Sequence, residues 1–225
     1  MNNPLFDMTG KVAVITGSTK GIGRSIAEEM ARCGAKVVIS SRKAEACEQV
    51  AAELKAQGFE AMAVPCHVGK KADLLNLVDK TNEAWGSIDV LVCNAATNPV
   101  YGPTAEMTDD AWDKIMDTNV KGTFWLTNMV LPQMAEKGEG AVVLLSSIAG
   151  LRGNTTIGTY GVSKAAEAAL ARNLAVEWGP RGIRINSIAP GLIKTDFAKA
   201  LWEDPIRVKR AEDKTPLRRI GDPVD

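Results

Sequence analysis

Short apolar runs alternate with longer amphipathic segments along most of this chain of 225 residues. The run at 12–16, Val-Ala-Val-Ile-Thr, has no polar alternation, which is typical of a strand buried on both faces of a parallel sheet. Ile22, Ile26 and Met30 then recur at the spacing of an amphipathic helix. The alternation predicts a doubly wound parallel α/β sheet of the Rossmann type with right-handed crossovers, in one domain over residues 1–225.

The pattern continues to near the end of the chain. We expect further strands at 37–41, 62–66, 88–93, 141–146 and 183–189, and further helices at 44–57, 71–85, 108–134 and 159–178. Pro65 implies that the third strand ends early or lies at a sheet edge, because proline cannot donate a ladder hydrogen bond. Gly221, Asp222 and Pro223 have the pattern of a helix start, so the last residues are either a frayed tail or the beginning of a further helix.

Composition and charge narrow the class of protein. The 27 basic and 27 acidic residues balance, and Lys and Arg are spread along the chain, so neither a nucleic-acid surface nor a membrane-binding patch is indicated. No apolar stretch reaches the length of a membrane span, and the first seven residues lack an export signal. The four cysteines form no CxxC and there is one histidine, which argues against a metal site. We expect a cytoplasmic protein.

A glycine-rich turn follows the first predicted strand. Its residues are Gly17, Ser18, Thr19, Lys20, Gly21, Ile22 and Gly23. Glycines there permit a tight turn and let backbone N–H groups approach phosphates at the start of a helix. The spacing is neither GxGxxG nor that of a P-loop. In this strand-turn-helix context the turn predicts a seat for a dinucleotide pyrophosphate.

The end of the second predicted strand distinguishes the two nicotinamide cofactors. A carboxylate there would bind the ribose hydroxyls of NAD(H), whereas this segment reads Ser40-Ser41-Arg42-Lys43 and holds no acid. Arg42 can pair with a 2′-phosphate, Ser41 can donate a hydrogen bond to it, and Lys20 can add charge. The segment favours NADP(H), although Arg42 and Lys43 could also be a solvated helix start.

Tyr160 and Lys164 are four residues apart and share one face of a predicted helix. A phenol with a pKa of about 10 is a weak acid-base group at neutral pH, and a nearby ammonium together with an oxidised nicotinamide would lower its pKa. The pair alone is a weak signal. Its weight comes from the glycine turn upstream.

Six motifs stand in the order typical of a known family. They are Thr16-Gly17-xxx-Gly21-x-Gly23, Asn94-Ala95-Ala96, Asn119-Val120, Ser146-Ser147, Tyr160-xxx-Lys164 and Pro190-Gly191. On these residues the chain resembles the short-chain dehydrogenase/reductase superfamily in its compact single-domain form. Within that superfamily it is similar to NADPH-dependent carbonyl and retinal reductases, notably in Cys66-His67-Val68-Gly69-Lys70.

The resemblance implies a role for each matched residue. Tyr160 is the general acid or base, Ser147 hydrogen-bonds the carbonyl oxygen, Lys164 holds the nicotinamide ribose and lowers the pKa of Tyr160, and Asn119 helps hold a relay water. The implied cofactor contacts outside the glycine turn are Ser41, Arg42, His67, Val68, Asn94, Ala95, Ala96, Tyr160, Lys164, Pro190, Gly191, Ile193 and Thr195. His67 replaces the aspartate that usually meets the adenine amine, and Ala96 replaces a glycine.

The resemblance also implies an activity and an assembly. We expect reversible reduction of a ketone or aldehyde by NADPH, with residues 192–214 as a substrate lid. Reduction of a 3-oxoacyl group on a carrier protein is the alternative enzyme, and an impaired dinucleotide-binding sensor is the alternative of another class. The family forms dimers or tetramers and normally continues with one more helix and strand, which this sequence lacks.

Overall fold

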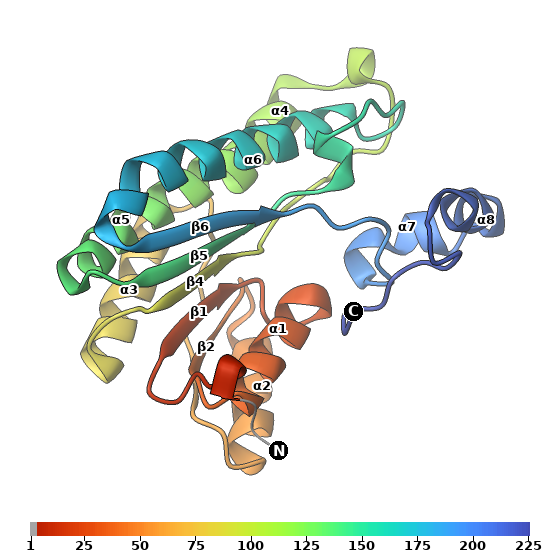
Figure 1. The fold of residues 1–225 in the computed structure, drawn as a ribbon. Coiled ribbons are helices and arrows are strands. Elements are labelled where there is room, and N and C mark those ends of the chain that lie inside the picture. Colours follow the sequence, from red (N-terminus) through yellow and green to blue (C-terminus); the bar gives the residue numbers. More distant parts are fainter. Residues whose placement is uncertain (1–3) are drawn as a thin grey trace.

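The computed structural model describes residues 4–225 as a parallel sheet of six strands between helices (Figure 1). The strands are β1 (Val12–Thr16), β2 (Lys36–Ser40), β3 (Ala61–Ala63), β4 (Val90–Cys93), β5 (Gly140–Leu145) and β6 (Ile183–Ile188). Their order across the sheet is β3-β2-β1-β4-β5-β6, and each neighbouring pair is parallel. The predicted doubly wound α/β fold is confirmed.

Helices cover both faces of this sheet (Figure 1). The covering helices are α1 (Gly21–Arg32), α2 (Ala44–Ala56), α3 (Lys71–Trp85), α4 (Asp109–Met116), α5 (Gly122–Lys137) and α6 (Gly158–Trp178). Two further helices, α7 (Lys199–Trp202) and α8 (Pro205–Lys214), lie to one side, beyond the end of β6 (Figure 1). One apolar cluster joins a face of the sheet to α3, α5 and α6. The other cluster joins the opposite face to α1 and α2. The sheet is therefore the common wall of two cores.

The strand order reverses direction between β1 and β4, which are neighbours in the sheet although two strands separate them in the chain. At such a switch point the loops leave the carboxyl ends of the strands in opposite directions and open a crevice. The loop after β1 carries the glycine turn, and the loop after β4 carries Asn94. The fold thus brings the first two motifs to one edge of the sheet.

The third strand ends at Ala63, ahead of Pro65, and lies at the edge of the sheet, which confirms the prediction made from Pro65. Two details differ from the sequence-based expectation. The helix expected at 108–134 is α4 and α5 joined by a π-helical turn at Asp117–Lys121. The expected helix start at 221–223 is instead a turn, in which the Asp225 amide donates to the Asp222 carbonyl at 3.0 Å.

Residues 1–3, which belong to the segment examined for an export signal, lie outside the described residues. In the part of the chain that the structure describes, no helix combines the length and the apolar character needed to cross a membrane.

Candidate active site

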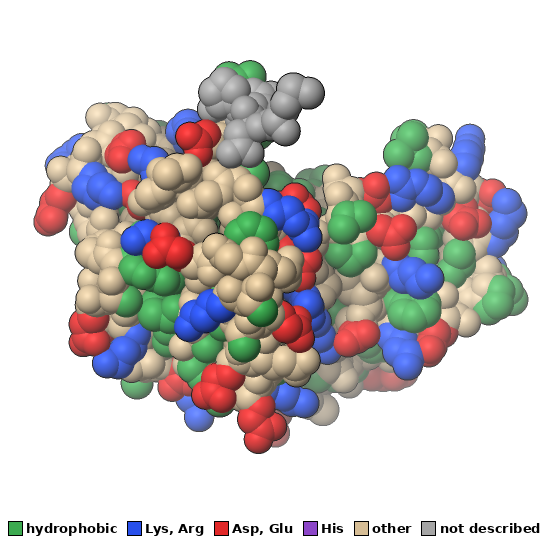
Figure 2. All heavy atoms as spheres, turned by 90° about the horizontal axis from the view of Figure 1, so that it is seen from below, with side chains coloured by type: hydrophobic (Ala, Val, Ile, Leu, Met, Phe, Trp, Pro, Cys, Tyr) green, Lys and Arg blue, Asp and Glu red, His purple; other side chains and the backbone are tan. Residues whose placement is uncertain are grey.

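A cavity of about 740 Å³ lies at the carboxyl ends of the strands, within the usual size range of cofactor sites. Every site residue predicted from the sequence lines it except Ser18 and Asn119. In Figure 2 the lobe on the right is the part that holds α7 and α8, and a recess lies between it and the body. Both helices belong to residues 192–214, the segment predicted to be a lid. Residues from 17 to 214 therefore meet around one space.

The glycine turn approaches the loop after β4 so closely that side chains are excluded. A Cβ atom on Gly23 would lie 2.4 Å from Asn94 Nδ2 and 2.5 Å from the Gly17 carbonyl oxygen. Gly17 also has a positive φ of 69°, which favours glycine. No side chain caps the first turn of α1, so its backbone N–H groups remain available. The turn fits an anionic phosphate group.

Two side chains fasten this turn to the sheet. Asn94 Nδ2 donates to the carbonyl oxygens of Thr16 at 2.8 Å and Gly17 at 3.2 Å. Ser18 is fully buried; its Oγ donates to the Ile15 carbonyl at 2.7 Å and accepts from the Ser40 amide at 2.8 Å. The Ser18 side chain therefore joins β1 to β2 and does not face the cavity.

The end of β2 presents polar and basic groups to the cavity. Ser41 Oγ lies 3.3 Å from Cys47 Sγ. Arg42 is exposed, and among the described residues no acidic side chain forms an ion pair with it. Lys20 Nζ lies 3.2 Å from Asp196 Oδ2, and both side chains are mostly exposed. Asp196 belongs to the lid, so this ion pair bridges the mouth of the cavity.

His67 and Val68 line the cavity beyond the end of β3. The His67 amide donates to Asp73 Oδ2 at 2.9 Å, and His67 Nδ1 accepts from the Gly69 amide at 3.1 Å. These bonds fix the imidazole ring in place.

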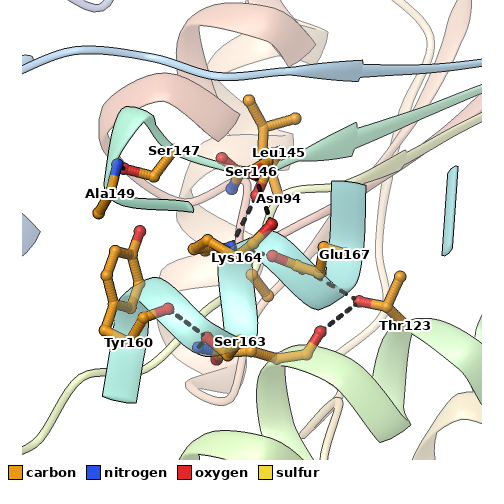
Figure 3. A network of polar contacts seen from close by, with 12 residues as sticks. Asn94, Thr123, Leu145, Ser146, Ser147, Ala149, Tyr160, Ser163, Lys164 and Glu167 are labelled. Carbon is orange, nitrogen blue, oxygen red and sulfur yellow. Dashed lines mark hydrogen bonds and ion pairs between the residues drawn. The ribbon is translucent and has the colours of Figure 1, made fainter. Parts of the chain in front are cut away.

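At the opposite end, Tyr160 on α6 points toward the loop that holds Ser147 (Figure 3). Ser147 Oγ accepts a hydrogen bond from the Ala149 amide at 3.1 Å. Burial raises the pKa of Tyr160, and the carboxylate of Glu167 adds to this rise, whereas a hydrogen bond with Ser147 lowers it. This direction is opposite to the one expected from Lys164 alone.

Burial of the phenol is the main cause, and the surroundings of Lys164 contribute to the difference. Its side chain is only 2% exposed, and Nζ donates to the Leu145 carbonyl at 2.6 Å. Glu167 Oε2 lies 2.6 Å from the same Nζ and is fully buried. The Lys164 ammonium also lies 5.6 Å from the centre of the Tyr160 ring. The same ammonium therefore interacts with both the Glu167 carboxylate and the tyrosine.

Sequence analysis missed Glu167. A signal was present, because this acid lies three residues after Lys164 in an otherwise alanine-rich stretch of the same helix. Burial raises its pKa to about 7, against the opposing effects of Lys164 and Thr123.

Asn119 occupies the π-helical turn between α4 and α5 and is fully buried. Its Nδ2 donates to the Thr97 carbonyl and to Ser163 Oγ, both at 3.0 Å, while its Oδ1 accepts from the Thr97 amide at 2.7 Å. The side chain thus clamps the loop after β4 onto α6. A π turn is frequent at functional sites, which agrees with this position.

The segment from Pro190 to the lid closes the same end of the cavity. Its predicted contacts Pro190, Gly191, Ile193 and Thr195 all line the cavity. Phe197 lies 5.9 Å from Tyr160 between ring centroids, and its carbonyl accepts from the Tyr101 hydroxyl at 3.3 Å. The lid therefore packs directly on the tyrosine.

The lid also contributes charge that sequence analysis did not assign to the cavity. Arg207, Arg210 and Lys214 follow one face of α8 and line the cavity with Arg152. The cavity wall therefore combines basic side chains with apolar ones.

Comparison with known proteins assigns the family. Over residues 11–206 the chain matches the family described as short chain dehydrogenase. It is 45% identical over 218 residues to Dehydrogenase/reductase SDR family member 4 of Oryctolagus cuniculus, covering 97% of this chain and 84% of that protein. It is 43% identical to the Homo sapiens protein of the same name, covering 97% of this chain and 78% of that protein.

A solved structure agrees with these relatives. The gluconate 5-dehydrogenase from Burkholderia cenocepacia J2315, in complex with NADP and tartrate, has a TM-score of 0.93 and 30% identity, over 97% of this chain and 86% of that one. The fold, the shared cavity and the relatives lead to one statement. The chain belongs to the short-chain dehydrogenase family of oxidoreductases, which act on CH–OH and C=O groups with a nicotinamide dinucleotide.

Proposed function

We propose that this protein reduces a ketone or aldehyde to an alcohol, reversibly, by hydride transfer from NADPH, with Tyr160 as the general acid. One observation carries the proposal: Tyr160 and Ser147 line the same cavity as the glycine turn and Arg42. A proton donor and a cofactor seat thereby share one space.

The residues divide the reaction between them. NADPH, when bound, supplies a hydride to the carbonyl carbon. Tyr160 gives its phenolic proton to the carbonyl oxygen, which completes the CH–OH group, and takes it back in the reverse direction. Ser147 Oγ accepts from the Ala149 amide, which orients its O–H to donate to the same carbonyl oxygen. Lys164 supplies the positive charge that favours the phenolate left on Tyr160.

Other lining residues would hold the cofactor. The glycine turn and the uncapped start of α1 suit its pyrophosphate. Ser41 and Arg42 suit a 2′-phosphate, which supports NADP(H) over NAD(H). The NADP in the Burkholderia cenocepacia enzyme supports the same choice. Lys164 would hold the nicotinamide ribose, with Thr195 at the carboxamide.

The role of Asn119 stays a proposal in two parts. Its buried amide already clamps Thr97 and Ser163, which supports a positioning role for the loop after β4. The relay water expected beside it is a further prediction. The homo-oligomer expected from the resemblance also stays a proposal.

The two alternatives receive less support. A carrier-protein reductase would need a basic docking surface on the lid, but Lys199, Arg207 and Lys209 are paired with Glu203, Asp204 and Asp213. A sensor without turnover would not need Ser147 and Tyr160 in one cavity.

The test uses the purified chain with NADPH and a panel of ketones and aldehydes, following loss of NADPH absorbance. Tyr160→Phe should lower kcat by about 10²–10⁴-fold. Tyr101→Phe is the matched control, because it removes the only other tyrosine hydroxyl from the same cavity and should have a far smaller effect. Unchanged turnover in Tyr160→Phe would show that the proposed mechanism is wrong.

A further inference from the structure

A buried acid stands directly behind the lysine of the proposed catalytic group. Glu167 and Lys164 are one turn apart on α6, with side chains 0% and 2% exposed. Their charged atoms are 2.6 Å apart. Burying a carboxylate costs free energy unless it is paired, so its place beside Lys164 needs an explanation beyond packing.

The groups that face Glu167 come from α6, α5 and β4, and Figure 3 shows those on the two helices. Lys164 and Tyr160 lie on its own helix, and Thr123 Oγ1 on α5 lies 3.4 Å from Glu167 Oε1. Thr123 Oγ1 in turn donates to the Asn119 carbonyl of the π turn at 2.8 Å. The Cys93 thiol on β4 is also near Glu167. Burial raises the pKa of this thiol, and the carboxylate of Glu167 raises it further, so the thiol stays neutral. Lys164 and Tyr160 are therefore the partners that respond to the charge of Glu167.

The Lys164 ammonium and the Glu167 carboxylate have opposite effects on the ionisation of Tyr160. An ammonium near Tyr160 favours the phenolate, whereas a carboxylate near Tyr160 disfavours it. Glu167 cancels much of the ammonium charge and also adds its own repulsion, and both effects keep the phenol protonated. A protonated Tyr160 is the form that reduces a carbonyl.

We propose that Glu167 is a positioning residue that holds Lys164 by its ammonium and, through this counter-charge, keeps Tyr160 in the proton-donating form over a wider pH range. This rests on the function proposed above. Above pH 7, where its carboxylate is ionised, Glu167 biases the enzyme toward carbonyl reduction, because alcohol oxidation needs the phenolate. No bond to Glu167 forms or breaks in this role.

The experiment compares the pH profile of kcat for Glu167→Gln with that of the wild type, in both directions, with NADPH and ketone or NADP⁺ and alcohol. Glutamine keeps the shape and an acceptor oxygen for Lys164 but removes the charge. The rise in oxidation and the alkaline fall in reduction should both move to lower pH by about one unit, the size expected for removal of a charge at short range. A merely structural role would change the height of the profile and leave its midpoint in place.

A second readout does not depend on turnover. The chain has two tyrosines, so a Tyr101→Phe background leaves Tyr160 as the only phenol to titrate by ultraviolet absorbance. In the NADP⁺ complex, adding Glu167→Gln to that background should lower the midpoint of phenolate formation by a similar amount. A midpoint that is unmoved or raised overturns the proposal.

Two control variants distinguish loss of the Glu167 charge from a general disturbance of α6 and its neighbours. Glu177→Gln makes the same change at an exposed position on α6, roughly 25 Å along the helix from Tyr160, and should leave the midpoint unmoved. Thr123→Val removes the hydroxyl near Glu167 and keeps the carboxylate charge, so its midpoint should stay near that of the wild type. A shift in Glu177→Gln equal to that in Glu167→Gln overturns the proposal.

Two failures can be told apart. If the wild type reduces no carbonyl compound, the proposed function is wrong. If the wild type is active and the midpoint of the pH profile does not move in Glu167→Gln, only the proposed role of Glu167 is wrong. If Glu167→Gln does not fold, Glu167→Asp retracts the carboxylate by one methylene and should shift the midpoint in the same direction by a smaller amount. An unmoved midpoint there overturns the proposal.

Discussion

The two ends of the cavity are built differently. At the catalytic end, Lys164 and Glu167 are buried, and the Lys164 ammonium is held by a carbonyl and a carboxylate, each at 2.6 Å. At the end of β2, Arg42 is exposed and has no acidic partner among the described residues, and Lys20 has only an exposed ion pair. The side chains around Lys164 are held in place before any ligand binds, whereas the cations near the end of β2 remain available to pair with a ligand.

The difference suits the roles proposed for the two ends. Proton transfer depends on a geometry held within fractions of an ångström, so buried hydrogen bonds suit it. Recognition of a phosphate depends on charge that is free to pair, and exposed charge is screened by salt. Substitutions at the two ends should therefore differ in size and in their response to conditions.

After that of Tyr160→Phe, the largest effect should come from Ser147→Ala at the proposed catalytic end. Loss of a hydroxyl aimed at the reacting oxygen should lower kcat by about 10²–10³-fold with little change in the Kd for NADPH. Steady-state kinetics and a fluorescence titration check the two halves of this statement. Ser146→Ala is the neighbouring control; its hydroxyl donates to the Lys164 carbonyl at 2.6 Å, so it should affect stability more than kcat.

The next effect concerns the free energy of unfolding and arises from Glu167. Burial raises the pKa of Glu167 to about 7, above its ordinary value of 4.5, so the stabilisation that comes from its protonation is fully present below pH 4.5 and is lost as the pH rises through 7. Urea unfolding at pH 5 and pH 8 should therefore show a loss of on the order of 2–3 kcal/mol in wild type that Glu167→Gln does not share. Equal losses in both proteins would contradict it.

A smaller effect is expected at the end of β2. Arg42→Ala should weaken NADPH binding by about 10–100-fold, the worth of a charged hydrogen bond, and leave NADH binding nearly unchanged. The measurement is a titration with each cofactor at two salt concentrations. Lys43→Ala, at the adjacent exposed cation, is the control. A similar loss for NADPH and NADH would mean that Arg42 does not read the 2′-phosphate.

The smallest effect should come from the exposed bridge between Lys20 and Asp196. An exposed ion pair contributes about 0–1 kcal/mol, so Asp196→Asn should change KM for the cofactor less than about 5-fold. High salt should abolish that difference. A larger change in KM that persists at high salt would show that the Lys20–Asp196 ion pair is not a weak, solvent-screened contact.

The sequence predicted the fold and most of the cavity for a physical reason. Parallel strands need apolar runs, and their carboxyl ends converge, so residues as distant as Gly17 and Thr195 could be placed together. The π turn at Asp117–Lys121 was not predictable, because its helical pattern continues through it. Ser18 was placed in the cavity, but whether a hydroxyl faces a ligand or the strand beneath depends on a single rotamer. Glu167 was missed because an acid in a helix is usually assigned to solvent.

The position of Trp202 gives the lid an optical property. Its indole N–H donates to the Thr195 carbonyl at 2.7 Å, and the Lys194 ammonium lies 5.6 Å from the ring centre. Indole emission responds to both a hydrogen bond and a nearby cation, and both partners belong to the segment that follows Pro190 and Gly191. The chain thus carries a fluorophore, one of its five tryptophans, within the lid. A ligand that displaces Thr195 or Lys194 will alter the colour or intensity of this emission without any added label.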